Sequence, residues 1–410
     1  MGILRAFLAF SVLAWHIRPA GYDRLTLLDG GVAVIVFFII SGFYMSMVVN
    51  EKYLHLENGR RRFFINRLLR IFPAYFAAMI LQQVVFSLDG VKTVFTGTLG
   101  LSHLTQISLI GMNLMKFGQD YWQTLVEHIQ TNGILGRTDQ VQIWASHIFG
   151  DKAFIYQPGT LLVGQGWSLA SELTYYLIAP LIAGMAWYYT GLIGVASFAV
   201  RIAFFVTLGS AYMGCWRTKF FPALIIFFIL GHFSYQIYRR ILNWKHRKIL
   251  ENLTVTLWIG LLVSTIWRQG LLVGVEYDST LDWIFYSFTV VSIPFLFSKT
   301  KDSRFDNLVG EFAYPIYLLH PIAIQIAFAH KLSSHQTIHY IQLIGVCLLM
   351  SYGMIISIER PINRLRQRIS RRERREVLNP GIIASKKIAT MGSHAPADTV
   401  SHGRRTGQSS

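Results

Sequence analysis

Arg5 and His16 lie in the first apolar segment of the chain, and the ten residues between them include one polar side chain, Ser11. A helix rises about 1.5 Å per residue, so His16 is expected roughly 16 Å from Arg5 along the axis. An ionisable group inside a membrane span indicates a functional site, and imidazole is the usual general base near neutral pH. We therefore expect catalysis from His16, with a buried histidine bonded to a neighbouring helix as the alternative. Arg5 is typical of an arginine that anchors a span at the membrane boundary.

Arg67 and Arg70 precede Pro73 at the entrance to a later apolar segment. Residues three apart share one helix face, so two guanidinium groups there would form a fork for phosphate oxygens. The neighbouring arginines at 60–62 indicate an alternative, in which all these residues only mark the cytoplasmic side of the membrane.

Glu172 opens an apolar run that follows Trp167 and Ser168. A helix start explains these residues, with Ser168 as the N-cap, Glu172 near the positive end of the dipole and Trp167 at the membrane interface. A carboxylate on the same membrane side as His16 would also orient that imidazole or bind a sugar hydroxyl. The sequence leaves both interpretations open.

Tyr317 and His320 are three residues apart, directly before Pro321, so they share one face of a helix that the proline kinks. A functional pair and a packing kink with a hydrogen-bonded histidine both fit this pattern. Ser41 and Gly42, in an earlier apolar segment, favour close packing of two helices because their side chains are small.

The composition is that of a membrane protein. Of 410 residues, 53% are hydrophobic and 14% are charged, and the mean hydropathy is +0.41; soluble domains carry about 25% charged residues. A net charge of +17 would suggest nucleic acid in a soluble protein. Here the basic residues lie in short loops between apolar runs. This placement indicates that they set the orientation of the chain in the membrane and bind anionic lipid, and we expect no nucleic-acid partner. Cys215 and Cys347 give neither a disulfide framework nor a metal motif.

Ten apolar stretches approach the roughly 20 residues that a membrane span needs. They are residues 3–20, 30–50, 71–89, 168–188, 191–209, 219–238, 252–268, 281–298, 311–329 and 338–358, with a very short turn near Tyr189 between the fourth and the fifth. Lysines and arginines gather at 51–70, 239–248, 299–304 and 360–375, which all fall on one side of a ten-span protein. Basic loops mark the cytoplasmic side, so both termini are expected in the cytoplasm.

Two regions are not spans. Residues 90–166 carry apolar side chains among glycines and histidines, and are expected to form a long extracytoplasmic loop that caps the helix bundle. The chain end is rich in Ser, Gly, Thr and basic residues, which predicts a disordered tail. The predicted organisation is an all-α transmembrane domain of residues 1–376 and a basic cytoplasmic tail of residues 377–410.

The order and spacing of these motifs resemble the membrane-bound acyltransferase-3 family, whose bacterial members O-acylate surface polysaccharides and lipopolysaccharide. The resemblance covers roughly residues 3–365. It rests on Arg5-x10-His16, Gly31-VAVIVFFII-Ser41-Gly42-Phe43, Arg67-x-x-Arg70, Trp167-SLAS-Glu172, Tyr314-PIYLL-His320-Pro321 and Glu359-Arg360-Pro361. It implies ten core helices and an acyl-CoA co-substrate, commonly acetyl-CoA, that binds from the cytoplasm, with no permanently bound cofactor. It also implies transfer to a hydroxyl on the far side of the membrane.

The resemblance assigns roles to the candidate residues. His16 is expected to deprotonate the acceptor hydroxyl, and Glu172 to orient His16 or to hold the acceptor. Arg67 and Arg70, with a contact from Arg5, are expected to bind the phosphates of acyl-CoA. No acidic residue directly follows His16, so a carboxylate that orients it must come from elsewhere.

Tyr317, His320, Trp167 and Ser168 are expected to bind substrate or to stabilise the oxyanion, with Arg5 as a further oxyanion candidate. The expected acceptor is a lipid-linked or polymeric glycan, such as exopolysaccharide or O-antigen. The expected location is the bacterial inner membrane, where the chain crosses several times among membrane lipids.

A transporter or flippase of polyprenyl-linked glycans is the main alternative, since it also needs many spans and charges within the membrane. It predicts internal repeats with broken helices in matching halves, and the sequence contains neither pattern. A non-catalytic scaffold would explain none of the polar residues within the spans.

Overall fold

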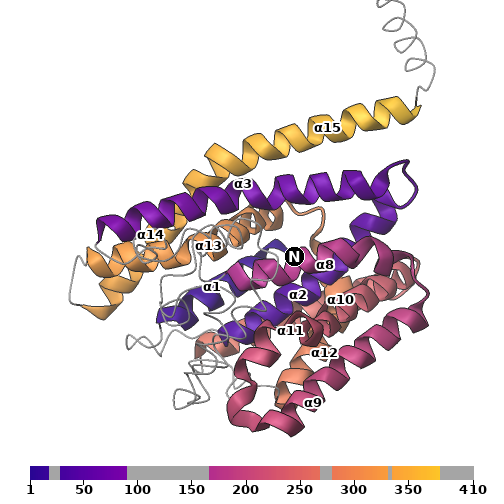
Figure 1. Cartoon of the computed structure of the whole chain (residues 1–410), viewed down its shortest axis with the longest axis horizontal. Helices are drawn as coiled ribbons and strands as arrows, with labels where there is room; N and C mark the ends of the chain where they lie inside the picture. The colour runs from indigo at the N-terminus through magenta and orange to yellow at the C-terminus, as the bar shows by residue number, and fades with distance from the viewer. Residues whose placement is uncertain (18–27, 90–165, 268–278, 331–334, 379–410) are drawn as a thin grey trace, which may run out of the picture. The chain divides into compact units, whose positions relative to one another are not determined.

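The computed structural model describes residues 1–17, 28–89, 166–267, 279–330 and 335–378, and the secondary-structure elements in these ranges are all helices (Figure 1). The α-helices are α1 (Gly2–Ile17), α2 (Gly30–Val48), α3 (Gly59–Leu88), α8 (Gly166–Gly184), α9 (Trp187–Lys219), α10 (Phe221–Ile241), α11 (Arg247–Trp267), α12 (Thr280–Thr300), α13 (Arg304–Ala329), α14 (Gln336–Met354) and α15 (Arg360–Leu378). Two π-helical turns, η3 (Val49–Tyr53) and η5 (Ile355–Glu359), follow α2 and α14. The all-α prediction is confirmed for this part of the chain.

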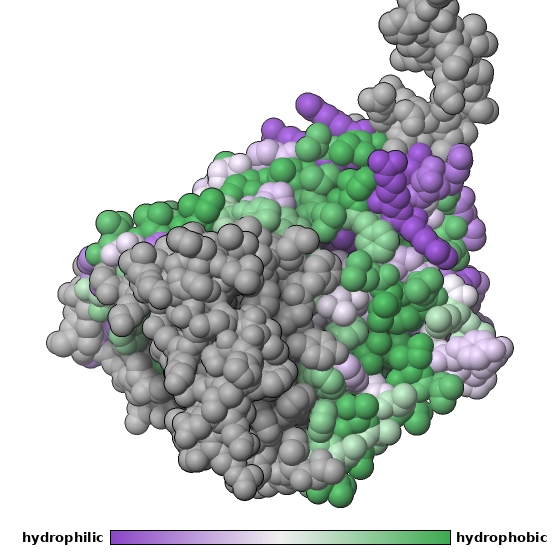
Figure 2. Space-filling view, viewed as in Figure 1, coloured by the Kyte–Doolittle hydropathy of each residue, from purple (hydrophilic) through white to green (hydrophobic). Residues whose placement is uncertain are grey.

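Seven helices or continuous helical runs among the described residues are long and apolar enough to cross a membrane: α2, α3, α9, α10, α12, α13 and a run that begins at Thr337. Their outward side chains are apolar too, and Leu192, Val206 and Leu349 are 66%, 74% and 73% exposed. Figure 2 shows hydrophobic side chains over much of the described surface. Such surface is typical of contact with lipid, so the chain is a multi-pass membrane protein. The count of ten spans and the orientation stay predictions.

Two predicted boundaries are wrong. The third span does not begin near residue 71, because α3 already starts at Gly59 and includes the arginine-rich segment. Asn58 precedes it in the left-handed region at φ 56°, and a Cβ on Gly59 would lie 2.0 Å from the Tyr53 carbonyl oxygen; this tight turn fixes the helix start. The break between α8 and α9 lies at residues 185–186, where Ala186 is extended, so Tyr189 is inside α9.

α1 and α13 form a parallel pair that positions the first motif against the Tyr-Pro-Ile-Tyr segment. At their first turns the backbones touch, because a Cβ on Gly2 would lie 1.7 Å from the Asp306 carbonyl oxygen. The Asp306 carboxylate accepts hydrogen bonds from the backbone N–H of Gly2 at 2.6 Å and of Ile3 at 3.0 Å. An acidic cap at a helix N-terminus is stabilising. The same register brings His16, near the end of α1, beside His320 of α13.

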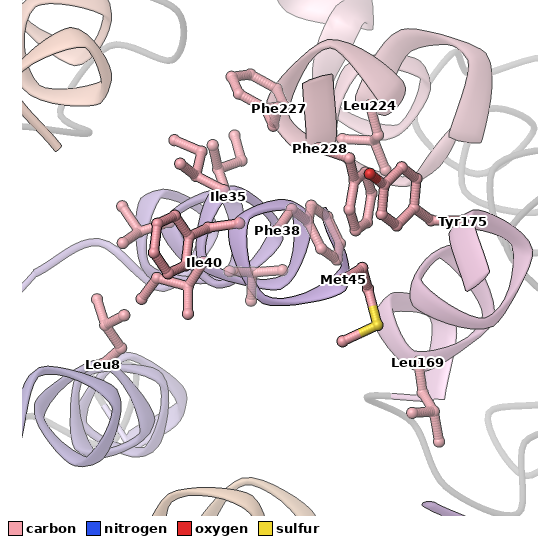
Figure 3. Close-up of a cluster of buried hydrophobic side chains, with 14 of the residues drawn as sticks. Leu8, Ile35, Phe38, Ile40, Met45, Leu169, Tyr175, Leu224, Phe227 and Phe228 are labelled. Carbon is pink, nitrogen blue, oxygen red and sulfur yellow. The ribbon is translucent and has the colours of Figure 1, made fainter. Parts of the chain in front are cut away.

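α2 and α10 pack closely through two glycines, as the Ser41-Gly42 pattern predicts. A Cβ on Gly42 would lie 2.1 Å from the Phe228 carbonyl oxygen, and one on Gly231 would lie 2.0 Å from that of Ile39. Beside this crossing, Phe228 is sandwiched between Phe38 and Tyr175, at ring-centroid distances of 4.8 and 4.3 Å (Figure 3). This apolar cluster joins α2, α8 and α10 and fixes one wall of the site.

The contacts divide the chain into two units, Met1–Glu359 and Arg360–Ser410, and α15 belongs to the second. The predicted extracytoplasmic cap at 90–165 lies outside the described residues, as does the tail from residue 379. The predicted boundary between residues 376 and 377 falls in the last turn of α15.

Candidate functional site

A cavity of about 230 Å³ lies among α1, α2, α3, α8 and α13. Five of the predicted site residues line it: Arg5, Arg70, Ser168, Glu172 and Tyr317. The other polar side chains in its wall are Ser41, Tyr44, Tyr176 and Tyr314, and the rest of the wall is mostly aliphatic and aromatic. The structure therefore brings together residues from five motifs that are far apart in the sequence.

Two arginines give the cavity a positive region. Arg5 of α1 and Arg70 of α3 both line it, and each lies within the electrostatic field of the other. Tyr44 of α2 lies near Arg5 and lines the same cavity. Among the described residues, no carboxylate lies within 4.0 Å of either guanidinium group. Glu172 and Glu359 act on Arg5 only at longer range, so two guanidinium groups without a direct ion pair in the described ranges suit an anionic ligand.

Glu172 supplies one carboxylate to the same cavity. Its Oε1 accepts a hydrogen bond from Ser41 Oγ at 2.7 Å and a second from the Tyr176 hydroxyl. No donor among the described residues reaches its Oε2, and the side chain lines the cavity. One oxygen of Glu172 is thus held by the protein, and the other is available to a ligand.

Arg67 does not share the cavity with Arg70. Its side chain is 5% exposed, and its guanidinium carbon lies 5.6 Å from the ring centroid of Phe63 and 6.0 Å from that of Tyr176. Tyr176 in turn lines the cavity and bonds Glu172. The structure places the two arginines of the predicted fork differently: Arg70 lines the cavity, and Arg67 supports its wall through cation–π contacts. Their shared role in phosphate binding stays a prediction.

Ser168 and Tyr317 close another part of the wall. The Ser168 hydroxyl and the Tyr317 hydroxyl are hydrogen-bonded across α8 and α13. Ser168 is not the N-cap that the sequence suggests, since α8 already includes Gly166 and Trp167. Trp167 lies outside the lining and packs edge-on against Phe38, with ring centroids 6.4 Å apart.

His16 and His320 lie outside the cavity lining and contact each other, with ring centroids 4.8 Å apart. The Tyr317 ring lies 5.9 Å from the ring of His320, so Tyr317 contacts both the cavity and this histidine pair. His16 is exposed and His320 is fully buried. The expected contact of Glu172 with His16 is absent: His16 Nδ1 bonds the Val12 carbonyl oxygen at 2.8 Å, and Glu172 bonds Ser41 and Tyr176.

Four polar residues of the cavity wall were not predicted as site residues: Ser41, Tyr44, Tyr176 and Tyr314. Three of them have a spacing in the sequence that could have indicated a site. Tyr176 follows Glu172 by four residues, so both lie on one helix face. Ser41 and Tyr44 are three residues apart on α2, which gives them the same relationship. The sequence analysis explains Ser41 by close helix packing and assigns no role to Tyr44 or Tyr176.

Comparison with known families identifies a match over most of the chain. A family model described as an acyltransferase domain, of the acyltransferase-3 type, matches residues 1–358. No curated protein and no solved structure matches the chain. The matched range includes every site residue described above.

Proposed function

The chain belongs to the acyltransferase-3 family and is a membrane acyltransferase, and on that basis we propose that it transfers an acetyl group from cytoplasmic acyl-CoA to a hydroxyl of a cell-surface glycan. The acceptor under this proposal is an exopolysaccharide or an O-antigen, presented at the outer face of a bacterial inner membrane. The reaction is an O-acyl transfer, in which a thioester is exchanged for an oxygen ester.

The composition of the cavity is the observation that supports the proposed donor. It combines the guanidinium groups of Arg5 and Arg70 with an aliphatic and aromatic wall and one carboxylate, Glu172. Acyl-CoA needs these elements, because its phosphates are anionic and its pantetheine arm is largely apolar with amide N–H groups. The available oxygen of Glu172 suits such an N–H or O–H donor.

His16 is the proposed general base. The Nε2 atom takes the proton of the acceptor hydroxyl as its oxygen attacks the thioester carbonyl. The tetrahedral intermediate then collapses, the C–S bond breaks, and the thiolate takes up a proton to leave as free CoA. Tyr317, next to the cavity and to His320, is the proposed donor to the developing oxyanion.

The proposal gives the Ser168–Tyr317 hydrogen bond a role in controlling access between the donor and the acceptor. Ser168 and Tyr317 line the cavity, whereas His16 and His320 do not. Under the proposal, this contact opens during transfer so that the thioester reaches the acceptor near His16. A closed contact keeps water from the donor while no acceptor is bound.

Structural analysis of the surface glycan by NMR tests this function. Cells with the intact chain are compared with cells that lack it and with cells that carry His16→Ala at matched expression. The proposal expects O-acetyl signals from one glycan to vanish in both altered strains. Unchanged O-acetyl signals in cells that lack the chain would contradict it.

A further inference from the structure

The imidazoles of His16 and His320 are in direct contact, and each comes from a different helix. Their ring centroids are 4.8 Å apart and the rings are tilted by 49°. His320 is 0% exposed, whereas His16 is exposed. The pair therefore joins a fully buried imidazole to one that a substrate can reach.

The backbone fixes the tautomer of both rings when they are neutral. His16 Nδ1 lies 2.8 Å from the Val12 carbonyl oxygen, and His320 Nδ1 lies 2.8 Å from the Tyr317 carbonyl oxygen. A carbonyl oxygen only accepts hydrogen bonds, so Nδ1 carries the hydrogen in each ring. A neutral imidazole has one N–H, so both Nε2 atoms carry a lone pair.

The Nε2 atom of His320 is buried, and among the described residues it has no hydrogen-bond partner. A buried polar atom without a partner is unfavourable, and in an enzyme it often marks a group that acts during the reaction. The neighbouring His16 acquires an Nε2–H when it accepts a proton. No hydrogen bond joins the two rings in the structure, and this N–H would supply a donor to His320 Nε2 once the rings approach.

We propose that His320 is a positioning residue for His16, and that the two rings share one proton between their Nε2 atoms while His16 is protonated. This rests on the proposed function, in which His16 is the general base. The proton leaves the acceptor hydroxyl, is held between His16 and His320, and passes to the thiolate as CoA leaves. The number of protons is conserved, and no other reactant is needed.

Other titratable groups lie on the helices that carry or contact this pair. They include Arg5 of α1, Glu311, Tyr314 and Tyr317 of α13, Tyr44 of α2, and His339, Tyr340 and Cys347 of α14, and Asp89 directly follows α3. Among the described residues, His16 is the group whose charge acts on His320. His339 is bonded to the Ala327 carbonyl oxygen, and Asp89 lies against Gln325 and His330 at the far end of α13.

Chemical modification of His16 tests the pair without relying on activity. Diethylpyrocarbonate reacts with neutral imidazole, and mass spectrometry of the full chain in lipid nanodiscs gives the extent of reaction at His16 at each pH. His320→Leu removes the acceptor nitrogen, and His320→Gln restores an acceptor oxygen. His339→Gln is the matched control, because His339 is also buried and bonded to a backbone carbonyl.

Sharing stabilises the protonated pair, so the modification midpoint should be highest in the wild type. A hydrogen bond to a charged group predicts that His320→Leu lowers the midpoint by about one to two pH units. His320→Gln should be intermediate and His339→Gln should match the wild type. Coincident midpoints in the wild type and His320→Leu would overturn the proposal.

Acyl transfer supplies the second measurement. His320→Leu should lower kcat about 10- to 100-fold and move the acid limb of the pH–rate profile to lower pH. A purely structural defect would lower the rate without moving the limb. If His16→Ala stays active while the modification midpoints of the wild type and His320→Leu differ, His16 is not the general base but the proton-sharing pair is supported. If His16→Ala is inactive while those midpoints coincide, the proton-sharing pair is contradicted and the role of His16 as general base is not.

Discussion

The Tyr317 hydroxyl is hydrogen-bonded to the Ser168 hydroxyl, and this contact joins α13 to α8 at the wall of the cavity. The Tyr317 ring also contacts Phe37, which lines the cavity, and His320, which does not. Tyr317 therefore lies at the boundary between the proposed donor site and the histidine pair.

Removal of this hydrogen bond should admit water to the donor. Ser168→Ala deletes one hydroxyl of the pair, keeps most of the packing and leaves Tyr317, the proposed oxyanion donor, in place. A neutral hydrogen bond contributes about 1 kcal/mol, so acetyl-CoA hydrolysis without acceptor should rise about fivefold. The rate of hydrolysis is measured from the release of free CoA with a thiol reagent. Tyr340→Phe on α14 is the control, and equal hydrolysis in all variants would argue against a closed wall.

The two arginines of the Arg67-x-x-Arg70 motif should respond differently to substitution. Arg70 lines the cavity, so Arg70→Ala should raise the KM for acetyl-CoA about 10- to 100-fold through loss of a charge-assisted hydrogen bond. Arg67 packs on Phe63 and Tyr176, so Arg67→Ala should mainly lower thermal stability and kcat.

Steady-state kinetics with purified protein separate these effects, and Arg60→Ala, an exposed arginine on the same helix, serves as the control. An unchanged KM in Arg70→Ala would contradict a phosphate role for Arg70. Equal KM increases in both variants would instead support the two-arginine fork that the sequence predicts.

Ser41 should act through Glu172. Ser41→Ala removes one of the two donors to Glu172 Oε1 and should lower kcat about tenfold. Glu172→Ala should lower kcat more than Ser41→Ala does. The double variant should have the same kcat as Glu172→Ala, because Ser41 then has no carboxylate to which it can donate a hydrogen bond. Ser46→Ala is the matched control, since Ser46 lies on the same helix and bonds His232 instead. Additive losses would show that Ser41 works independently of Glu172.

Gly42 should be essential for the α2–α10 contact. Its missing Cβ would lie 2.1 Å from the Phe228 carbonyl oxygen, so Gly42→Ala should destabilise the fold by about 1–3 kcal/mol. Gly345→Ala on α14 is the control, because a Cβ there meets open space. Thermal unfolding in detergent compares the two. Equal melting temperatures would contradict the close approach.

The local sequence pattern predicted much of the helical fold and some of the residues that line the cavity. Apolar runs located the membrane helices, and the small pair Ser41-Gly42 predicted a close helix crossing. Boundaries failed where polar residues continue a helix beyond the apolar run, as at Gly59 of α3. Ser168 was misassigned because its partner, Tyr317, is 149 residues away and no local pattern indicates it.

The contact of His16 with His320 illustrates the same limit. Each histidine was a candidate by itself, but their pairing depends on the register between α1 and α13, which the touching backbones of Gly2 and Asp306 set. For Arg67 and Arg70, local spacing predicts a similarity of position that the structure does not show. Their spacing predicts a shared helix face, yet Arg70 lines the cavity while Arg67 packs on Phe63 and Tyr176.

Transfer of labelled acetyl from acetyl-CoA to the purified surface glycan is the most direct measurement of the central claim. The full chain in proteoliposomes is compared with His16→Ala at equal protein content. The account predicts labelled glycan with the wild type and none above background with His16→Ala, while acetyl-CoA binding is retained. Equal labelling by both proteins, or none by the wild type with any surface glycan of the cell, would contradict it.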